Sequence, residues 1–271
     1  MHRFYISPED WDSRALALRG SEVHHARNVL RMKAGDKLVL FNGKGRELTA
    51  EIANVADDEI RLRKLHEAET APLSCRIVLG QAIPKGKNMD LIVQKAVEIG
   101  AAEIAPIISD RTVVHVDSEL AAQKQSKWQQ IAIEAAKQCG QNWLPRVHPP
   151  KKLADFFAGV EAGVSSAESQ ANQPARLPLH KSAVAFDLRL IGSLQPDAHH
   201  LKTILESYSS EHGDRPRSVL MLVGPEGDFT PAELALARCN GCQPITLGPI
   251  ILRVETAAIY CLSILSYELL I

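Results

Sequence analysis

The first seventy residues alternate between apolar and polar side chains, which is the pattern of half-buried strands. The alternation predicts strands over residues 37–41, 46–55 and 59–65. Asn42-Gly43 lies between the first two strands, and this dipeptide is the strongest short signal for a hairpin turn. We therefore expect a small β-barrel over residues 1–71, with a short linker at its end.

Beyond residue 72 the apolar positions change to alternating strand and helix spacings. The pattern predicts strands at 76–80, 104–108, 184–186, 219–223 and 245–247, and helices at 89–99, 118–138, 201–208, 230–238 and 256–270. Such alternation is typical of an α/β domain with a parallel sheet, which we expect over residues 72–271. The stretch 159–178 is rich in Ala, Ser, Gln and Pro, and we expect a surface loop there.

A glycine-rich loop, residues 224–227, directly follows the wholly apolar strand predicted at 219–223. Glycine allows positive φ angles and lets the backbone approach a ligand closely. Thr230 and Glu233 then predict a capping box at the start of a helix, with Pro231 at its first position. Because open α/β sheets bind ligands at the carboxyl ends of their strands, we interpret this loop as a ligand site. A tight strand–helix turn is the alternative.

A second loop, residues 247–255, also follows a predicted strand and also leads into a helix. Its apolar middle, Ile250-Ile251-Leu252, is unusual for a loop and has to be covered by an adenine ring, a partner subunit or tucked backbone. Arg253 and Glu255 follow directly, and a structural ion pair between them is the simpler interpretation.

A third glycine-containing loop, residues 80–88, resembles a phosphate-binding P-loop but does not match one. It has one residue too many between Gly80 and Gly86, and Asn88 stands where a magnesium-binding Ser or Thr is needed. We therefore exclude a nucleoside triphosphatase. The G-x-G-x-x-G pattern of a Rossmann-type nucleotide site is also missing after the first strand of the α/β region.

Composition and charge restrict the class of protein further. The 271 residues are 45% hydrophobic and 23% charged, as in ordinary globular proteins, and the net charge of −1 gives no overall basic signature. Residues 24–46 are locally basic, which favours either RNA contact or a solvated surface. The basic residues of this stretch are Arg27, Arg31, Lys33, Lys37, Lys44 and Arg46, against the single acid Asp36.

No secretory signal is visible, so we expect none, and the uncharged part of the most apolar stretch, 256–267, is too short to span a bilayer. We expect a cytoplasmic protein without a membrane segment. Its five cysteines then favour reduced thiols. Cys239 and Cys242 are interpreted as a helix terminus, because no second pair of metal ligands follows them, and we expect no metal site.

Together these motifs resemble the RsmE family of SPOUT methyltransferases. The matching segments are residues 24–31, 43–45, 85–87, 94–100, 110–112, 134–139, 224–227 and 251–257. The resemblance implies methylation of N3 of one uridine, conventionally number 1498, in 16S ribosomal RNA of the small subunit, with S-adenosylmethionine as the methyl donor. It also implies a PUA-like RNA-binding barrel, an α/β domain tied in a trefoil knot, and a homodimer. The predicted C-terminal helix is apolar nearly all round, and burial in a dimer interface fits it.

The resemblance assigns roles to particular residues. Cofactor contacts are expected from Leu222, Val223, Gly224, Pro225, Glu226, Gly227, Leu247, Gly248, Ile251 and Leu252. RNA contacts are expected from His24, Arg27, Arg31, Lys33, Lys85, Lys87 and Arg111. Our catalytic hypothesis is that Arg253 stabilises the uracil anion or orients a phosphate, while Glu255 orients Arg253 or acts as base.

The chain departs from the family pattern at four positions. The pattern has glycine where Asp228 stands and arginine where Ile250, Gln141 and Trp143 stand. Asp228 therefore needs a compatible backbone angle, and Asp tolerates the left-handed conformation better than most residues. Two alternatives stay open: a non-enzymatic RNA-binding factor for ribosome assembly, and a SPOUT methyltransferase with another RNA target.

Overall fold

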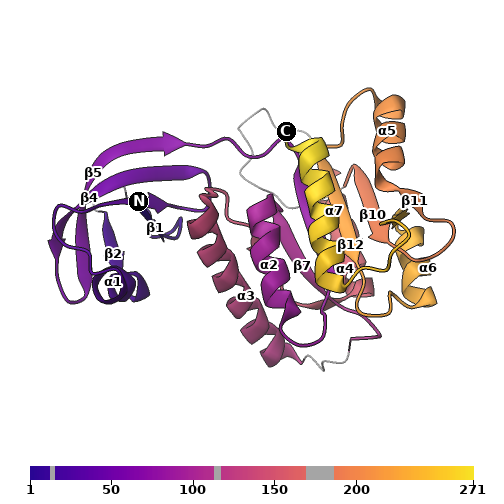
Figure 1. Cartoon of the computed structure of the whole chain (residues 1–271), viewed down its shortest axis with the longest axis horizontal. Helices are drawn as coiled ribbons and strands as arrows, with labels where there is room; N and C mark the ends of the chain where they lie inside the picture. Colours follow the sequence, from indigo (N-terminus) through magenta and orange to yellow (C-terminus); the bar gives the residue numbers. More distant parts are fainter. Residues whose placement is uncertain (13–15, 113–116, 169–185) are drawn as a thin grey trace. The chain divides into compact units, whose positions relative to one another are not determined.

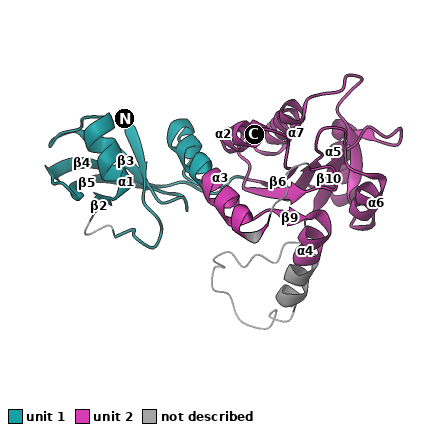
Figure 2. Cartoon of the chain, turned by 90° about the horizontal axis from the view of Figure 1, so that it is seen from below, with its two compact units in different colours: residues 1–73, 130–145 teal, residues 74–129, 146–271 magenta. Residues whose placement is uncertain are grey.

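The computed structural model describes residues 1–12, 16–112, 117–168 and 186–271. These residues form two compact units, coloured separately in Figure 2. One unit comprises residues 1–73 and 130–145, and the other comprises residues 74–129 and 146–271. This division concerns compactness alone, so the expected boundary between an RNA-binding and a catalytic domain at residue 71 stays a prediction.

The first unit is built on a curled five-stranded sheet with the order β1-β3-β4-β5-β2. Its strands are β1 (His2–Tyr5), β2 (Ala17–Arg19), β3 (Lys37–Phe41), β4 (Arg46–Val55) and β5 (Glu59–Glu69). The short helices α1 (Ser21–His24) and η1 (His25–Val29) add Val23 and Ala26 to its apolar core. The three strands predicted here are confirmed, whereas β1 and β2 are too short to show a sequence period.

The second unit is a parallel sheet with helices on both faces. The strand order is β11-β13-β10-β12-β6-β7-β8, with β9 also paired to β7. The strands are β6 (Arg76–Ala82), β7 (Glu103–Ile108), β8 (Arg146–Val147), β9 (Lys151–Lys152), β10 (Leu188–Gly192), β11 (His199–His200), β12 (Ser218–Val223) and β13 (Gln243–Thr246). The predicted α/β architecture with a parallel sheet is therefore confirmed.

Two layers of helices enclose this sheet (Figures 1 and 2). Helices α2 (Asn88–Ile99) and α7 (Val254–Leu269) pack against each other on one face. Helices α4 (Leu153–Glu168) and α6 (Pro231–Cys239) share an apolar cluster with side chains on the other face, such as those of Val78 and Leu220. The two remaining long helices are α3 (Ser118–Cys139) and α5 (Leu201–His212). No described helix is long and apolar enough to cross a membrane.

The prediction of a surface loop at 159–178 is wrong for its first half, because α4 continues to Glu168. Leu153 and Phe157 lie one helical turn apart and are both buried, so the start of the helix is held by packing. Residues 169–178 lie outside the described part of the chain.

Two other element bounds differ from expectation. Residues 184 and 185 of the strand predicted at 184–186 lie outside the described part, and the strand found nearby is β10, Leu188–Gly192. The last helix begins at Val254, with Arg253 as its N-cap, rather than behind a Thr256 cap. Arg253 therefore stands at the junction of loop and helix.

The chain path explains why a long loop precedes α7. Strand β13 pairs with β10, whereas α7 packs over β6 and β12, further along the sheet. The intervening residues 247–253 therefore cross the carboxyl ends of β10 and β12. These strands all finish at the same end of the sheet, and we call this end the carboxyl edge.

Candidate active site

Three loops meet at the carboxyl edge and enclose a cavity of about 380 Å³, which we call the loop cavity. They comprise residues 192–194 after β10, 223–228 after β12 and 246–254 after β13. Nine of the ten expected cofactor residues line it: Val223, Gly224, Pro225, Glu226, Gly227, Leu247, Gly248, Ile251 and Leu252. Leu222 does not line it, because this side chain is fully buried in the sheet.

Sequence reasoning missed several residues of the loop cavity. Gly192, Ser193, Leu194, Thr246, Val254, Ala257 and Cys261 also line it. The first three follow β10, the strand whose position was not predicted. A correct placement of that strand would have pointed to them, since ligands gather where parallel strands end.

The loop after β12 is held by its own backbone geometry and by one carboxylate. Gly227 and Asp228 both have positive φ angles, 88° and 70°, so Asp228 adopts the left-handed conformation, which Asp tolerates better than most residues. The Asp228 carboxylate accepts the N–H of Phe229 at 2.8 Å and that of Leu194 at 3.3 Å. It thereby ties the loop after β10 to the loop after β12.

The predicted capping box of α6 is confirmed, and its glutamate does more than cap the helix. The buried Glu233 carboxylate accepts the N–H of Thr230 at 2.8 Å. It also accepts the N–H of Asp110 at 3.0 Å and the hydroxyl of Ser109 at 3.1 Å. Because a buried carboxylate needs several donors, these bonds fix the turn that follows β7 and carries Arg111.

Three cations expected to contact RNA lie at the carboxyl edge. The Arg111 guanidinium donates to the carbonyl of Gly227, and the backbone N–H of Lys85 donates to the Glu226 carboxylate at 3.1 Å. Lys87 is the exposed residue that precedes α2. The turns after β6 and β7 are therefore both attached to the loop after β12.

Arg253 and Glu255 lie close in sequence but have different environments. Arg253 is exposed and lines the loop cavity, whereas Glu255 is half-buried in the first turn of α7. Glu255 accepts a hydrogen bond from the Asn88 side chain at 3.1 Å. In the described part of the chain no ion pair joins Arg253 to Glu255. The simple structural pair suggested by the sequence is thus not formed.

The apolar middle of the last loop is not covered by the chain itself. Ile250 and Ile251 are 74% and 76% exposed, which excludes tucked backbone as their cover. Helix α7 is not buried all round either, since Tyr260 and Tyr267 are exposed. A ligand or a second subunit is left to cover these side chains.

The basic residues expected to contact RNA in the first unit are exposed around α1 and η1. His24 and Arg27 belong to these helices, and Arg31 and Lys33 follow them. Arg27 forms an ion pair with Asp57 at 2.5 Å, and the other three side chains are exposed.

Trp143 is built into the packing of the first unit. Its indole N–H donates to the carbonyl of Thr70 at 2.8 Å, and its ring lies 2.9 Å from where a Cβ on Gly45 would be. Gln141 accepts the Trp143 backbone N–H at 3.3 Å. The two departures from arginine therefore have a structural role here.

The cysteines lie apart from this chemistry, except Cys261 in the cavity wall. Burial raises the pKa of Cys75, Cys242 and Cys261 to about 12, so these thiols are protonated. Helix α6 ends at Cys239, which confirms the interpretation of Cys239 and Cys242 as a helix terminus. The described residues contain no cluster of His, Cys, Asp and Glu suited to a metal ion.

Two family models match the chain. Residues 71–266 match the RNA methyltransferase domain, and residues 18–65 match the RNA methyltransferase PUA domain. A solved structure of ribosomal RNA small subunit methyltransferase E from Neisseria gonorrhoeae is 31% identical, with a TM-score of 0.76 and coverage of 99% of this chain and 98% of that one. The chain belongs to the ribosomal RNA small subunit methyltransferase E family. It is an RNA methyltransferase with the fold class expected from its sequence.

Two further relatives agree with this family. Ribosomal RNA small subunit methyltransferase E of Bacillus subtilis is 29% identical over 272 residues, which cover 99% of this chain and 97% of the relative. A methyltransferase from Legionella pneumophila is 32% identical, with a TM-score of 0.78 and coverage of 98% and 97%. The Legionella and Neisseria structures both contain bound S-adenosylmethionine.

Proposed function

We propose that this enzyme methylates N3 of one uracil, at the uridine conventionally numbered 1498, in 16S ribosomal RNA. The observation that carries the proposal is the loop cavity at the carboxyl edge, with Arg253 at its rim and three further cations on neighbouring turns. Residues 72–271 carry the methyltransferase site, and residues 1–71 bind RNA. The substrate is the RNA or the small ribosomal subunit, which places the enzyme in the cytoplasm.

The loop cavity suits S-adenosylmethionine, which supplies the methyl group when it is bound. Its volume of about 380 Å³ lies within the range of small-molecule sites. Ile251, Leu252 and Ala257 offer an apolar wall to an adenine ring, and Ile251 is exposed in the chain alone. A Cβ on Gly248 would meet open space, so the backbone there is accessible to a ligand. The nine lining residues predicted from sequence are the proposed cofactor contacts.

Methylation at N3 needs a group that accepts the N3 proton of uracil or stabilises the anion that its loss creates. The N3 lone pair becomes available only when this proton leaves, and base pairing hides N3, so the base has to be unpaired or flipped out. Arg253 has an exposed guanidinium at the cavity rim and stabilises the negative charge of the deprotonated ring. Our candidate for the proton acceptor is Glu255, which accepts a hydrogen bond from Asn88 next to the loop that carries Arg253.

A homodimer accounts for the apolar surface that the chain leaves exposed. Tyr260, Tyr267, Ile250 and Ile251 are 46–76% exposed on α7 and the loop before it. Large apolar side chains left exposed on one element and the loop before it are typical of interaction surfaces. Light scattering should give twice the chain mass, and Tyr267→Glu should shift the protein towards the monomer. A wild-type monomer at micromolar concentration would contradict the dimer.

The decisive test identifies the modified nucleoside. Small subunits and 16S RNA from a strain lacking this gene are incubated with the enzyme and isotopically labelled S-adenosylmethionine, and the digested RNA is examined by mass spectrometry. Label in 3-methyluridine alone, at one site, is the expected result. Label in another base or in a ribose would mean a different RNA target. Failure to bind S-adenosylmethionine in calorimetry would indicate a non-enzymatic assembly factor.

A further inference from the structure

A second hollow of about 510 Å³ adjoins the loop cavity, and we call it the α6 groove. Leu194, Gly227 and Asp228 line both hollows, so the loops after β10 and β12 form their common wall. Arg111, one of the expected RNA contacts, also lines it, but the cofactor contacts do not account for a second hollow here.

One side of the α6 groove is a helix face, and the other is a loop. Pro231, Leu234, Ala235 and Arg238 occur at positions i, i+3, i+4 and i+7 of α6, which places them on one face. The facing wall is the loop 194–197 that leaves β10. The result is a trough lined by both apolar and charged side chains.

The charged side chains of the α6 groove differ in whether their partners are backbone groups or another side chain. The Asp228 carboxylate is taken up by two backbone N–H groups, and Arg111 donates only to backbone carbonyls. Arg238 is paired with Asp197, whose two oxygens lie 2.9 and 2.7 Å from one guanidinium nitrogen. These two side chains are 42% and 55% exposed, so an incoming anion can compete with Asp197 for Arg238.

We infer that the α6 groove binds an unpaired nucleotide of the RNA beside the methylated base, an inference that rests on the proposed function. Its phosphate is bound by Arg238 and Arg111, because guanidinium groups pair with phosphate oxygens in a planar, bidentate geometry. Its base lies on the apolar lining of Leu194, Pro196 and Pro231, which is indifferent to base identity. Since the two hollows share a wall, this nucleotide would hold the strand next to the methyl donor.

The Arg238–Asp197 pair allows a test in which two substitutions should change RNA affinity in opposite directions. If Arg238 contacts phosphate, Arg238→Gln should weaken RNA binding, whereas Asp197→Asn should strengthen it by removing a competing anion. If the pair only stabilises the loop, both substitutions should have the same direction of effect or none.

The experiment measures the Kd of a fluorescent single-stranded RNA that contains the target uridine, over a series of salt concentrations, together with methylation kinetics. Arg238→Gln should raise Kd and KM about five- to tenfold and reduce the salt slope by about 1, as expected for one lost phosphate contact. Asp197→Asn should lower Kd about two- to threefold, as expected for one removed surface charge. Ala235→Trp, which fills the groove, should raise Kd without changing the affinity for S-adenosylmethionine.

The matched control is the exposed pair Arg217–Asp214, whose side chains are 82% and 68% exposed and which lines neither hollow. Arg217→Gln and Asp214→Asn should leave Kd and its salt slope unchanged. Unaltered RNA binding by Arg238→Gln, shifts of the same sign in both groove variants, or a changed cofactor affinity would overturn the inference. A wild-type enzyme that does not methylate the RNA would instead overturn the proposed function.

Discussion

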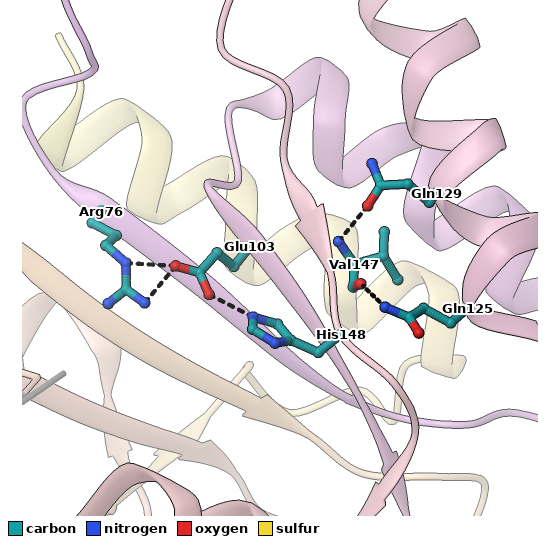
Figure 3. Close-up of polar contacts among 6 residues, drawn as sticks. All are labelled: Arg76, Glu103, Gln125, Gln129, Val147 and His148. Carbon is teal, nitrogen blue, oxygen red and sulfur yellow. Dashed lines mark hydrogen bonds and ion pairs between the residues drawn. The ribbon is translucent and has the colours of Figure 1, made fainter. Parts of the chain in front are cut away.

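The charged side chains at the two ends of the parallel sheet differ in their partners. At the amino end, Arg76 of β6, Glu103 of β7 and His148 after β8 bind one another (Figure 3). The Arg76 guanidinium donates to one Glu103 oxygen at 2.5 and 2.8 Å, and the His148 ring lies 2.5 Å from the other oxygen. At the carboxyl edge, Arg111 donates only to carbonyls and Arg253 has no carboxylate partner within the described residues.

This difference separates stability from function within one sheet. Groups that satisfy one another contribute to folding and have little capacity left for a ligand. Exposed cations beside glycine-rich loops contribute little to folding and are available to phosphates and to a developing anion. Substitutions at the amino end should therefore change the free energy of unfolding, and those at the carboxyl edge should change methylation.

The largest effect is expected from Arg253→Ala. Loss of a cation that stabilises the uracil anion should lower kcat by roughly 10²–10³-fold, which corresponds to about 3–4 kcal/mol. The measurement is single-turnover methylation of the RNA with saturating cofactor. The midpoint of thermal unfolding should stay within about 1 °C, since an exposed side chain without an ion pair contributes little to folding.

Arg253→Lys is the matched control, because it keeps the charge and loses the planar fork. We expect it to recover part of the rate, on the order of tenfold above the alanine variant. Full activity in Arg253→Ala with normal folding would remove this residue from the chemistry.

The next effect is a dependence of stability on acid at the amino end. Burial by itself raises the pKa of the Glu103 carboxyl, but the His148 hydrogen bond and the charge and hydrogen bonds of Arg76 outweigh it and lower the pKa to about 2. Because the folded pKa is depressed from 4.5, the stabilisation is complete above pH 4.5 and is lost as the pH falls towards 2. The loss amounts to at most about 3.5 kcal/mol, at about 1.4 kcal/mol per pKa unit.

Glu103→Gln separates this contribution from that of other carboxylates. At neutral pH the variant should be less stable by about 2 kcal/mol, because Arg76 is left half-buried and unpaired. Between pH 4.5 and pH 2 its unfolding free energy, measured with urea, should change less than that of the wild type. Parallel pH profiles would show that the cluster makes no net contribution.

The carboxyl edge was more accessible to sequence reasoning than the amino end. Gly224 and Gly227 follow an apolar strand, and Thr230 with Glu233 forms a capping box, so local spacing alone located the loop and the helix start. Glu103, in contrast, lies 27 residues from Arg76 and 45 from His148. No local pattern connects such partners, because the contact exists only once three strands are aligned.

The failures at the site have a similar cause. The residues after β10 were missed because this strand is short and carries Arg189 near its start, which weakens the apolar signal. The α6 groove combines residues from α6 and from the loops after β7, β10 and β12, so it follows from strand order rather than from a motif. The Asn88–Glu255 contact depends in the same way on α2 packing against α7.

A smaller effect on methylation is expected from Asn88→Ala. Loss of the hydrogen bond to Glu255, worth about 1 kcal/mol, should reduce kcat about fivefold with little change in KM for RNA. Asn88→Asp should lower kcat further, because two carboxylates would face each other. Asn88 also begins α2, so a change in thermal unfolding with unaltered kcat would reduce it to a helix-start residue.

The smallest effect concerns the edge strand beside the Arg76–Glu103–His148 cluster. Val147 of β8 is fully buried, and its neighbours Arg146 and His148 donate their N–H groups towards β7. Its own N–H and carbonyl therefore point to the other side, where two glutamines of α3 replace a missing strand (Figure 3). The Gln129 side chain accepts this N–H at 2.9 Å, and the Gln125 side chain donates to the carbonyl at 3.1 Å.

Gln125→Ala should lower the free energy of unfolding by about 0.5–1 kcal/mol, the net contribution of one hydrogen bond. The methylation rate and both KM values should be unchanged, since the glutamine contacts the amino-end half of the sheet. Urea unfolding and steady-state kinetics on the same preparation measure both quantities, with Gln123→Ala on the exposed side of α3 as control. A kinetic change in the fully folded variant would mean that the two ends of the sheet are coupled, and that stability and function are not separated between them.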